Sequence, residues 1–162
     1  MQRYLAAVTH HMTMGRLRIA QSPIGPLPCL TGVGSIVAAS EFPIELAVCV
    51  ATLDEVSPAA VRDFRRQVNE FARSLRGRSE FAERVGAGAV AALVSERVDP
   101  AALRAMKNKL MSYGSLVVPA VVDLGNRQLH IASNAPVIGR VVWNEIRSQA
   151  RDYLPEPRLV LG

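Results

Sequence analysis

Three aspartates in this sequence have a placement that suits divalent metal binding. Asp54, Asp99 and Asp123 each follow an apolar run that we predict to be a β-strand. The carboxyl ends of parallel strands share one edge of a sheet, where α/β proteins bind ligands. Carboxylate oxygens are the ligands that Mg²⁺ and Mn²⁺ prefer, and such an ion activates water for phosphoester cleavage. A metal-dependent phosphoesterase or nuclease with these three ligands is therefore one hypothesis.

A structural role explains the same aspartates more simply. Aspartate is a preferred residue at helix N-termini and in turns. Asp99 precedes Pro100, and proline is favoured in the first turn of a helix. No histidine or further glutamate joins the aspartates at a fixed spacing. Our favoured interpretation therefore contains no cofactor, and Mg²⁺ or Mn²⁺ belongs only to the alternative.

Neither of two glycine patterns predicts a nucleotide site, and we assign no catalytic residue. Residues 86–91 match the G-x-G-x-x-A pattern, but they follow a predicted helix, whereas a dinucleotide site requires a preceding strand. Residues 32–34 lack the third small residue. We interpret both patterns as turns. His130 lies on the polar side of a predicted edge strand, where we expect it to face solvent.

A set of arginines suggests a third kind of ligand. We predict a helix that begins at Ser57 and Pro58 and ends near Gly77. The arginines that lie off its apolar stripe are Arg62, Arg65, Arg66, Arg73 and Arg76. Such side chains can contact phosphates. The whole chain has only four Phe, three Tyr and one Trp that could stack on bases. A solvated helix face is therefore the simpler interpretation, and nucleic-acid binding is the third hypothesis.

The remaining elements alternate between strands and helices. We predict strands over residues 44–53, 89–98 and 116–123, and a hairpin that returns over 128–132. A helix from Asp99 to Tyr113 separates the second strand from the third, and Asn134 caps a last helix that ends before Pro155. Residues 1–40 form a poorly defined segment with one or two weak strands.

This order predicts a single α/β domain over residues 41–162. Two successive strand–helix–strand units imply a mixed sheet with a parallel βαβαβ centre. The C-terminal hairpin adds an antiparallel edge, and three main helices flank the sheet.

Composition limits the class of protein. The chain has 162 residues, of which 49% are apolar and 20% charged, and its net charge is +5. These values exclude a disordered chain, a collagen and a coiled coil. Two cysteines make no disulfide framework, and we expect a reducing cytoplasm. The most apolar stretch, residues 28–53, is interrupted by glycines and glutamates, so we expect no membrane span.

The favoured function is therefore a non-catalytic, cytoplasmic binding or assembly module. The expected partner is another protein or a second copy of this chain. The hairpin over residues 116–132 offers an edge strand along which a second copy could pair.

Overall fold

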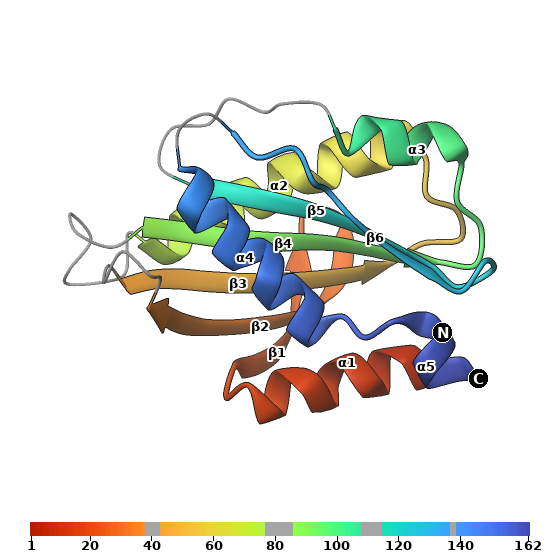
Figure 1. Cartoon of the computed structure of the whole chain (residues 1–162), viewed down its shortest axis with the longest axis horizontal. Helices are drawn as coiled ribbons and strands as arrows, with labels where there is room; N and C mark the ends of the chain where they lie inside the picture. Colours follow the sequence, from red (N-terminus) through yellow and green to blue (C-terminus); the bar gives the residue numbers. More distant parts are fainter. Residues whose placement is uncertain (38–42, 77–85, 108–114, 137–138) are drawn as a thin grey trace.

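The structure is a computed structural model that describes residues 1–37, 43–76, 86–107, 115–136 and 139–162. Helices and strands alternate along the chain (Figure 1). The elements are α1 (Gln2–Met14), β1 (Arg18–Ile24), β2 (Leu27–Val37), β3 (Pro43–Thr52), α2 (Pro58–Arg76), β4 (Gly86–Ser95), α3 (Pro100–Ala105), β5 (Ser115–Asp123), β6 (Gln128–Ile131), α4 (Arg140–Tyr153) and α5 (Pro157–Leu161). The predicted helix end near Gly77 and the part of the predicted Asp99–Tyr113 helix after residue 107 lie outside the described residues.

All strands belong to one sheet of six, in the order β1-β2-β3-β4-β5-β6. β1, β2 and β3 pair antiparallel, β3, β4 and β5 pair parallel, and β6 returns antiparallel to β5. This arrangement confirms the predicted α/β fold with its parallel centre and C-terminal hairpin. The N-terminal strands extend the same sheet.

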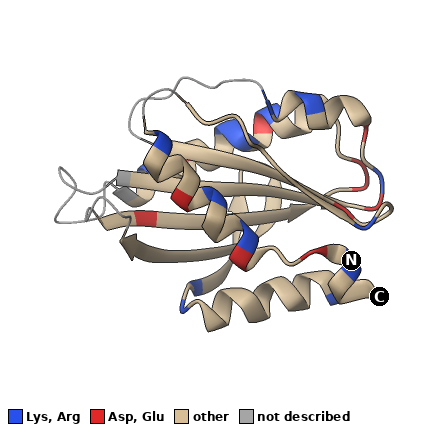
Figure 2. Ribbon diagram, viewed as in Figure 1, with Lys and Arg blue, Asp and Glu red and all other residues tan. Residues whose placement is uncertain are grey.

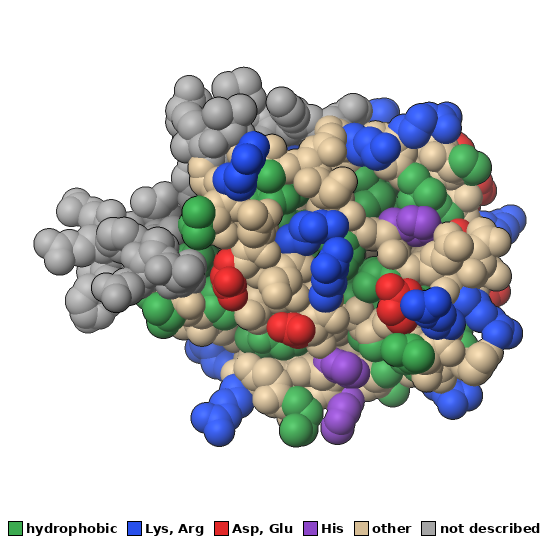
Figure 3. Space-filling view, viewed as in Figure 1, with side chains coloured by type: hydrophobic (Ala, Val, Ile, Leu, Met, Phe, Trp, Pro, Cys, Tyr) green, Lys and Arg blue, Asp and Glu red, His purple; other side chains and the backbone are tan. Residues whose placement is uncertain are grey.

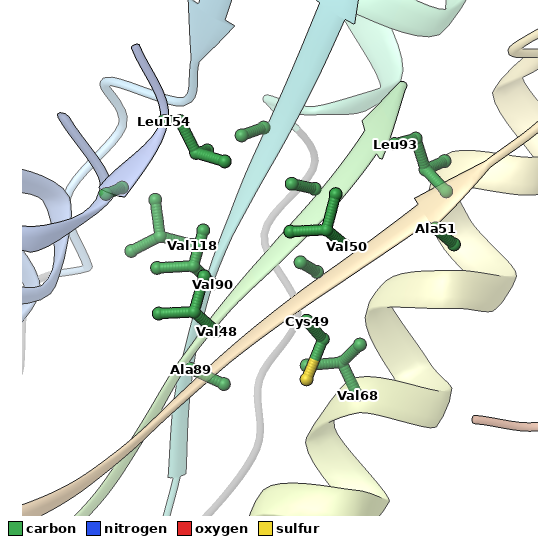
Figure 4. Packing of buried hydrophobic residues seen from close by; sticks show 14 of the residues in the cluster. Val48, Cys49, Val50, Ala51, Val68, Ala89, Val90, Leu93, Val118 and Leu154 are labelled. Carbon is green, nitrogen blue, oxygen red and sulfur yellow. The ribbon is translucent and has the colours of Figure 1, made fainter. Parts of the chain in front are cut away.

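Helices cover both faces of the sheet. In register, Val48, Val90 and Val118 lie side by side on β3, β4 and β5. Figure 4 shows these valines pointing toward Leu154, while Cys49 points to the opposite side, toward Val68 of α2. α1 and α4 cover the valine face, and α2 and α3 pack on the other (Figure 1). Because β3, β4 and β5 are covered on both sides, they are apolar along most of their length.

The sequence predicts α2 well because its start and its apolar stripe are both explicit. Ser57 caps the helix, and its Oγ accepts a hydrogen bond of 3.1 Å from the Ala60 amide. Val61, Phe64 and Val68 are buried against the sheet. The prediction that Arg65 lies off this stripe is wrong: it is 8% exposed, because it stands four residues after Val61 and three before Val68.

The N-terminal region is more ordered than the sequence predicts. Residues 2–14 form α1, which buries Tyr4, Val8 and Met12 on one side. Cys29 lies in a strand and not in a loop, since β1 and β2 form a hairpin whose tight turn contains Gly25 at a φ of 57°. A positive φ favours glycine.

Both glycine patterns lie within strands, which corrects our interpretation of them as turns. A β-carbon built on Gly32 of β2 would lie 2.9 Å from Sδ of Met12. One on Gly88 of β4 would lie 2.9 Å from Cγ1 of Ile146. These glycines therefore let α1 and α4 approach the sheet closely.

The last helix begins later than predicted. α4 starts at Arg140, after Gly139 at a φ of 81°. Asn134 does not cap it, and its Nδ2 instead donates a hydrogen bond of 3.3 Å to the Lys107 carbonyl. α5, which the sequence analysis does not predict, follows at Pro157 and packs against α1.

Candidate ligand-binding groove

Asp99 acts as a helix cap. Its Oδ1 accepts a hydrogen bond of 2.8 Å from the Ala101 amide, and Pro100 opens α3. This bond satisfies one of the amides that a helix N-terminus leaves without an internal partner. The structural interpretation of Asp99 is confirmed.

Asp123 holds the turn between β5 and β6. It is 4% exposed, and its carboxylate accepts hydrogen bonds from Asn126: 2.9 Å from the amide to Oδ1 and 2.8 Å from Nδ2 to Oδ2. The carboxylate therefore has local partners that replace its lost hydration.

Asp54 and Asp123 share the predicted edge of the sheet. Ser95 pairs with Asp123 in register, and its Oγ donates a hydrogen bond of 3.0 Å to the Asp54 carbonyl. Within the described ranges, no group of three or more His, Cys, Asp and Glu side chains is placed to hold a metal ion. The phosphoesterase hypothesis is therefore supported only by the position of Asp54 and Asp123 at the same edge of the sheet. It stays a prediction.

The structure separates Arg65 from the exposed arginines of α2. Arg65 is buried, which lowers the pKa of its guanidinium. Arg66 Nη2 lies 3.7 Å from Oδ1 of Asp63 on the exposed side of the helix. Arg62 and Arg73 are exposed, and the Arg76 side chain lies outside the described residues.

A hollow of about 770 Å³ runs along the outer edge of β6; we call it the β6 groove. The consecutive residues 129–133 all line it. Successive side chains of a strand point to opposite faces, so these residues can line one hollow only if it follows the strand's edge. Residues of α3 line it from one face of the sheet and residues of α4 from the other.

Apolar and basic side chains both line the β6 groove, and we call the apolar set its floor and the basic set its rim. The apolar lining includes Leu103, Met106, Leu129, Ile131, Leu154 and Leu159. Lys107, Arg147 and Arg151 also line it, with Glu156 as the one carboxylate. Figure 2 shows basic residues along α4, and Figure 3 shows basic side chains next to hydrophobic ones and a histidine on this face of the molecule.

The basic side chains of the β6 groove have no acidic partner among the described residues. No ion pair within 4.0 Å joins Lys107, Arg147 or Arg151 to a carboxylate in the part of the chain that the structure describes. Nε of Arg147 is buried and has no hydrogen-bond partner in the part of the chain that the structure describes. A buried donor without a partner costs roughly 1–3 kcal/mol.

The backbone of β6 also has hydrogen-bonding groups that face away from β5. The Ala132 amide donates a bond of 3.0 Å to the Pro119 carbonyl, so residue 132 faces β5. Since antiparallel residues alternate, His130 also faces β5, whereas Leu129 and Ile131 direct their N–H and C=O groups outward. No described residue forms a hydrogen bond with these outward groups.

Comparison with known proteins assigns no family to this chain. No family model, no curated protein and no solved structure matches it. Only the sequence and geometry of this chain therefore bear on its function.

Sequence reasoning missed the β6 groove because its walls come from distant segments. Lys107, His130 and Arg147 meet only after the sheet and its helices assemble. One signal was present in the sequence: Arg147 and Arg151 are four residues apart, a spacing that places them on one side of a helix. His130 is half-buried and lines the groove, whereas we expected it to face solvent.

None of the described helices is long and apolar enough to cross a membrane.

Proposed function

We propose that this chain is a non-catalytic binding module that uses the β6 groove to hold an acidic segment of another protein. The observation that carries the proposal is the excess of cationic groups at the groove. Lys107, Arg147 and Arg151 face one carboxylate, Glu156, and none of the three forms an ion pair with a described residue. Charge complementarity across an interface selects partners and accelerates association.

The apolar floor favours a polypeptide over a free inorganic anion. Leu103, Leu129 and Ile131 offer apolar surface that only a ligand with apolar side chains would cover. In an acidic segment with interspersed apolar residues, the acidic side chains would pair with the basic residues of the groove and the apolar side chains would cover its apolar residues.

A nucleic acid fits the β6 groove less well. Single-stranded nucleic acid binds where aromatic side chains stack on bases. No Phe, Tyr or Trp is among the residues that line the groove. Arg65 is also buried, which withdraws it from the set of arginines that we expected to contact phosphates.

A second copy of this chain also fits less well. Pairing of two β6 edges would bring Lys107, Arg147 and Arg151 of one copy near the same residues of the other. Like charges placed together at an interface are unfavourable. The proposed partner is therefore a different, acidic protein.

The proposal locates this module in the cytoplasm. Support comes from Cys29 and Cys49, which are both free and buried. Free cysteines are usual in reducing compartments.

Binding of fluorescein-labelled poly-L-glutamate, measured by fluorescence anisotropy, tests the proposed function. A variant with Arg147→Gln and Arg151→Gln removes two positive charges from the β6 groove. The matched control, Arg62→Gln with Arg66→Gln, removes two exposed charges from α2. We expect about tenfold weaker binding in the groove variant and less than about twofold in the control.

Two results would overturn the proposal. An equal loss in both variants would show that only net charge attracts the polymer. Tighter binding of a single-stranded oligonucleotide than of poly-L-glutamate, at the same salt concentration, would favour the nucleic-acid hypothesis. Thermal unfolding of each variant checks that the fold is intact.

A further inference from the structure

The outward backbone of β6 offers a way to hold a partner that the charges alone do not. Leu129 and Ile131 each present an N–H and a C=O group that no described residue uses. An edge strand with unpaired groups is a template for another strand. Partners that exploit such an edge bind as an additional strand, with main-chain hydrogen bonds giving affinity and side-chain pockets giving specificity.

We infer that the acidic segment binds in extended form, as a seventh strand next to β6. The inference rests on the proposed function and adds the conformation and contacts of the ligand. Main-chain hydrogen bonds to Leu129 and Ile131 fix the segment, and the cations of the groove hold its acidic side chains.

Side chains of an added strand would point alternately to the two faces of the sheet, and the groove has one wall on each face. Leu129 and Ile131 pair with Val122 and Ala120, whose side chains share a face with Val118, so they point to the α4 side. His130 points to the α3 side. On the α4 side lie Arg147 and Arg151, and on the α3 side lies Lys107. Acidic residues at alternate positions of the segment therefore meet the two arginines.

Pro119 sets the end of β6 and so the length of the exposed edge. Its carbonyl accepts from Ala132, and a residue's N–H and C=O point to the same side of a strand. Proline has no N–H, so the carbonyl of Ala132 finds no donor there. The ladder between β5 and β6 ends at Ile131. The docked strand consequently has two outward-facing residues of β6 to pair with.

The opposite edge of the sheet is protected. β1 carries Arg18 and Pro23 in exposed positions. Charged residues and proline are the usual means of blocking an edge strand. This difference favours strand addition at β6 over strand addition at β1.

A proline substitution at an outward position separates backbone pairing from charge. Ile131→Pro removes the outward N–H but leaves the inward bonds of β6 to β5, because proline is tolerated on the open side of an edge strand. Ile131→Val is the matched control, since it keeps the N–H and a β-branched side chain. The probe is a fluorescein-labelled octapeptide of alternating Glu and Val. We expect Ile131→Pro to weaken its binding about fivefold to tenfold and Ile131→Val less than about twofold.

Methylation of the probe's own amides gives a second, independent readout that does not depend on a variant folding. Alternate amides of a strand face opposite edges. One peptide is N-methylated at every Val and the other at every Glu. Strand addition predicts that one of the two loses binding and the other keeps it.

The outcomes distinguish this inference from the proposed function. Loss with one methylated set only, together with loss in Ile131→Pro, supports strand addition. Strand addition is wrong if the wild-type protein binds both methylated peptides as tightly as the unmethylated octapeptide, and if Ile131→Pro binds the octapeptide as tightly as the wild type does. The acidic-segment function then still stands. If neither the octapeptide nor poly-L-glutamate binds, both proposals fail.

Discussion

Ile146 of α4 packs directly on the backbone of β4 at Gly88. A β-carbon at position 88 would lie 2.9 Å from Cγ1 of Ile146 and closer still to its Cδ1. Ile146 is fully buried, and α4 carries Arg147 and Arg151 to the β6 groove. The small residue at position 88 thus sets how closely the helix that supplies the groove's arginines can approach the sheet.

Substitution Gly88→Ala is expected to destabilise the protein by about 1–3 kcal/mol, because an extra carbon overpacks this contact. Ile146→Val removes the Cδ1 that would clash, so it should lessen the penalty in the double variant. Urea unfolding of the wild type, both single variants and the double variant measures the coupling. Penalties that simply add would contradict the contact between these two residues.

The cap of α3 gives a second prediction. Asp99→Ala removes the acceptor for the Ala101 amide, and we expect a loss of about 1 kcal/mol in the free energy of unfolding. Asp99→Asn should stay close to the wild type, because asparagine also caps helices. A midpoint of thermal unfolding that millimolar Mn²⁺ raises in the wild type but not in Asp99→Asn would instead assign this residue to a metal site.

The sequence predicts the features of this molecule that a few consecutive residues determine, and it does not predict those that distant segments form together. The strand at 44–53 and helix α2 are readable because proline, serine and an uninterrupted stripe mark them within a few residues. Tyr4, Val8 and Met12 carried a helical spacing too, but α1 has no side-chain cap to mark its start. For Arg65 the helix was predicted but the burial was not. This charged residue lies on the apolar stripe, and only the packing of α2 against the sheet reveals that it is buried. The β6 groove could not be predicted, since Lys107 and Arg151 come to line one hollow only after the sheet and its helices assemble.

The two thiols should be unreactive in the folded protein. Burial raises the pKa of Cys29 to about 11, and burial, with a smaller effect of Cys29, raises that of Cys49 further. The thiolate is the reactive form, so an aromatic disulfide reagent at slightly alkaline pH should label both cysteines only after unfolding. The unfolded chain loses these protons at lower pH than the folded chain, and stability should therefore fall as the pH rises above about 9. Rapid labelling of Cys49 without denaturant would show that the core around β3 opens easily.

Tyr4 joins α1 to the segment before α5, and this contact gives the last prediction. Its hydroxyl is buried and donates a hydrogen bond of 2.9 Å to the Pro155 carbonyl. Burial, and to a smaller extent the charge of Glu156, raises the pKa of Tyr4 well above its usual range. The folded chain thus keeps this proton at a pH where the unfolded chain releases it, so the contribution of Tyr4 is complete below about pH 10 and declines above it. Tyr4→Phe should cost about 1 kcal/mol near neutral pH and should flatten the loss of stability at alkaline pH. Urea unfolding of both proteins across this pH range measures the two effects, and an unchanged alkaline slope in Tyr4→Phe would mean that Tyr4 ionises freely in the folded protein.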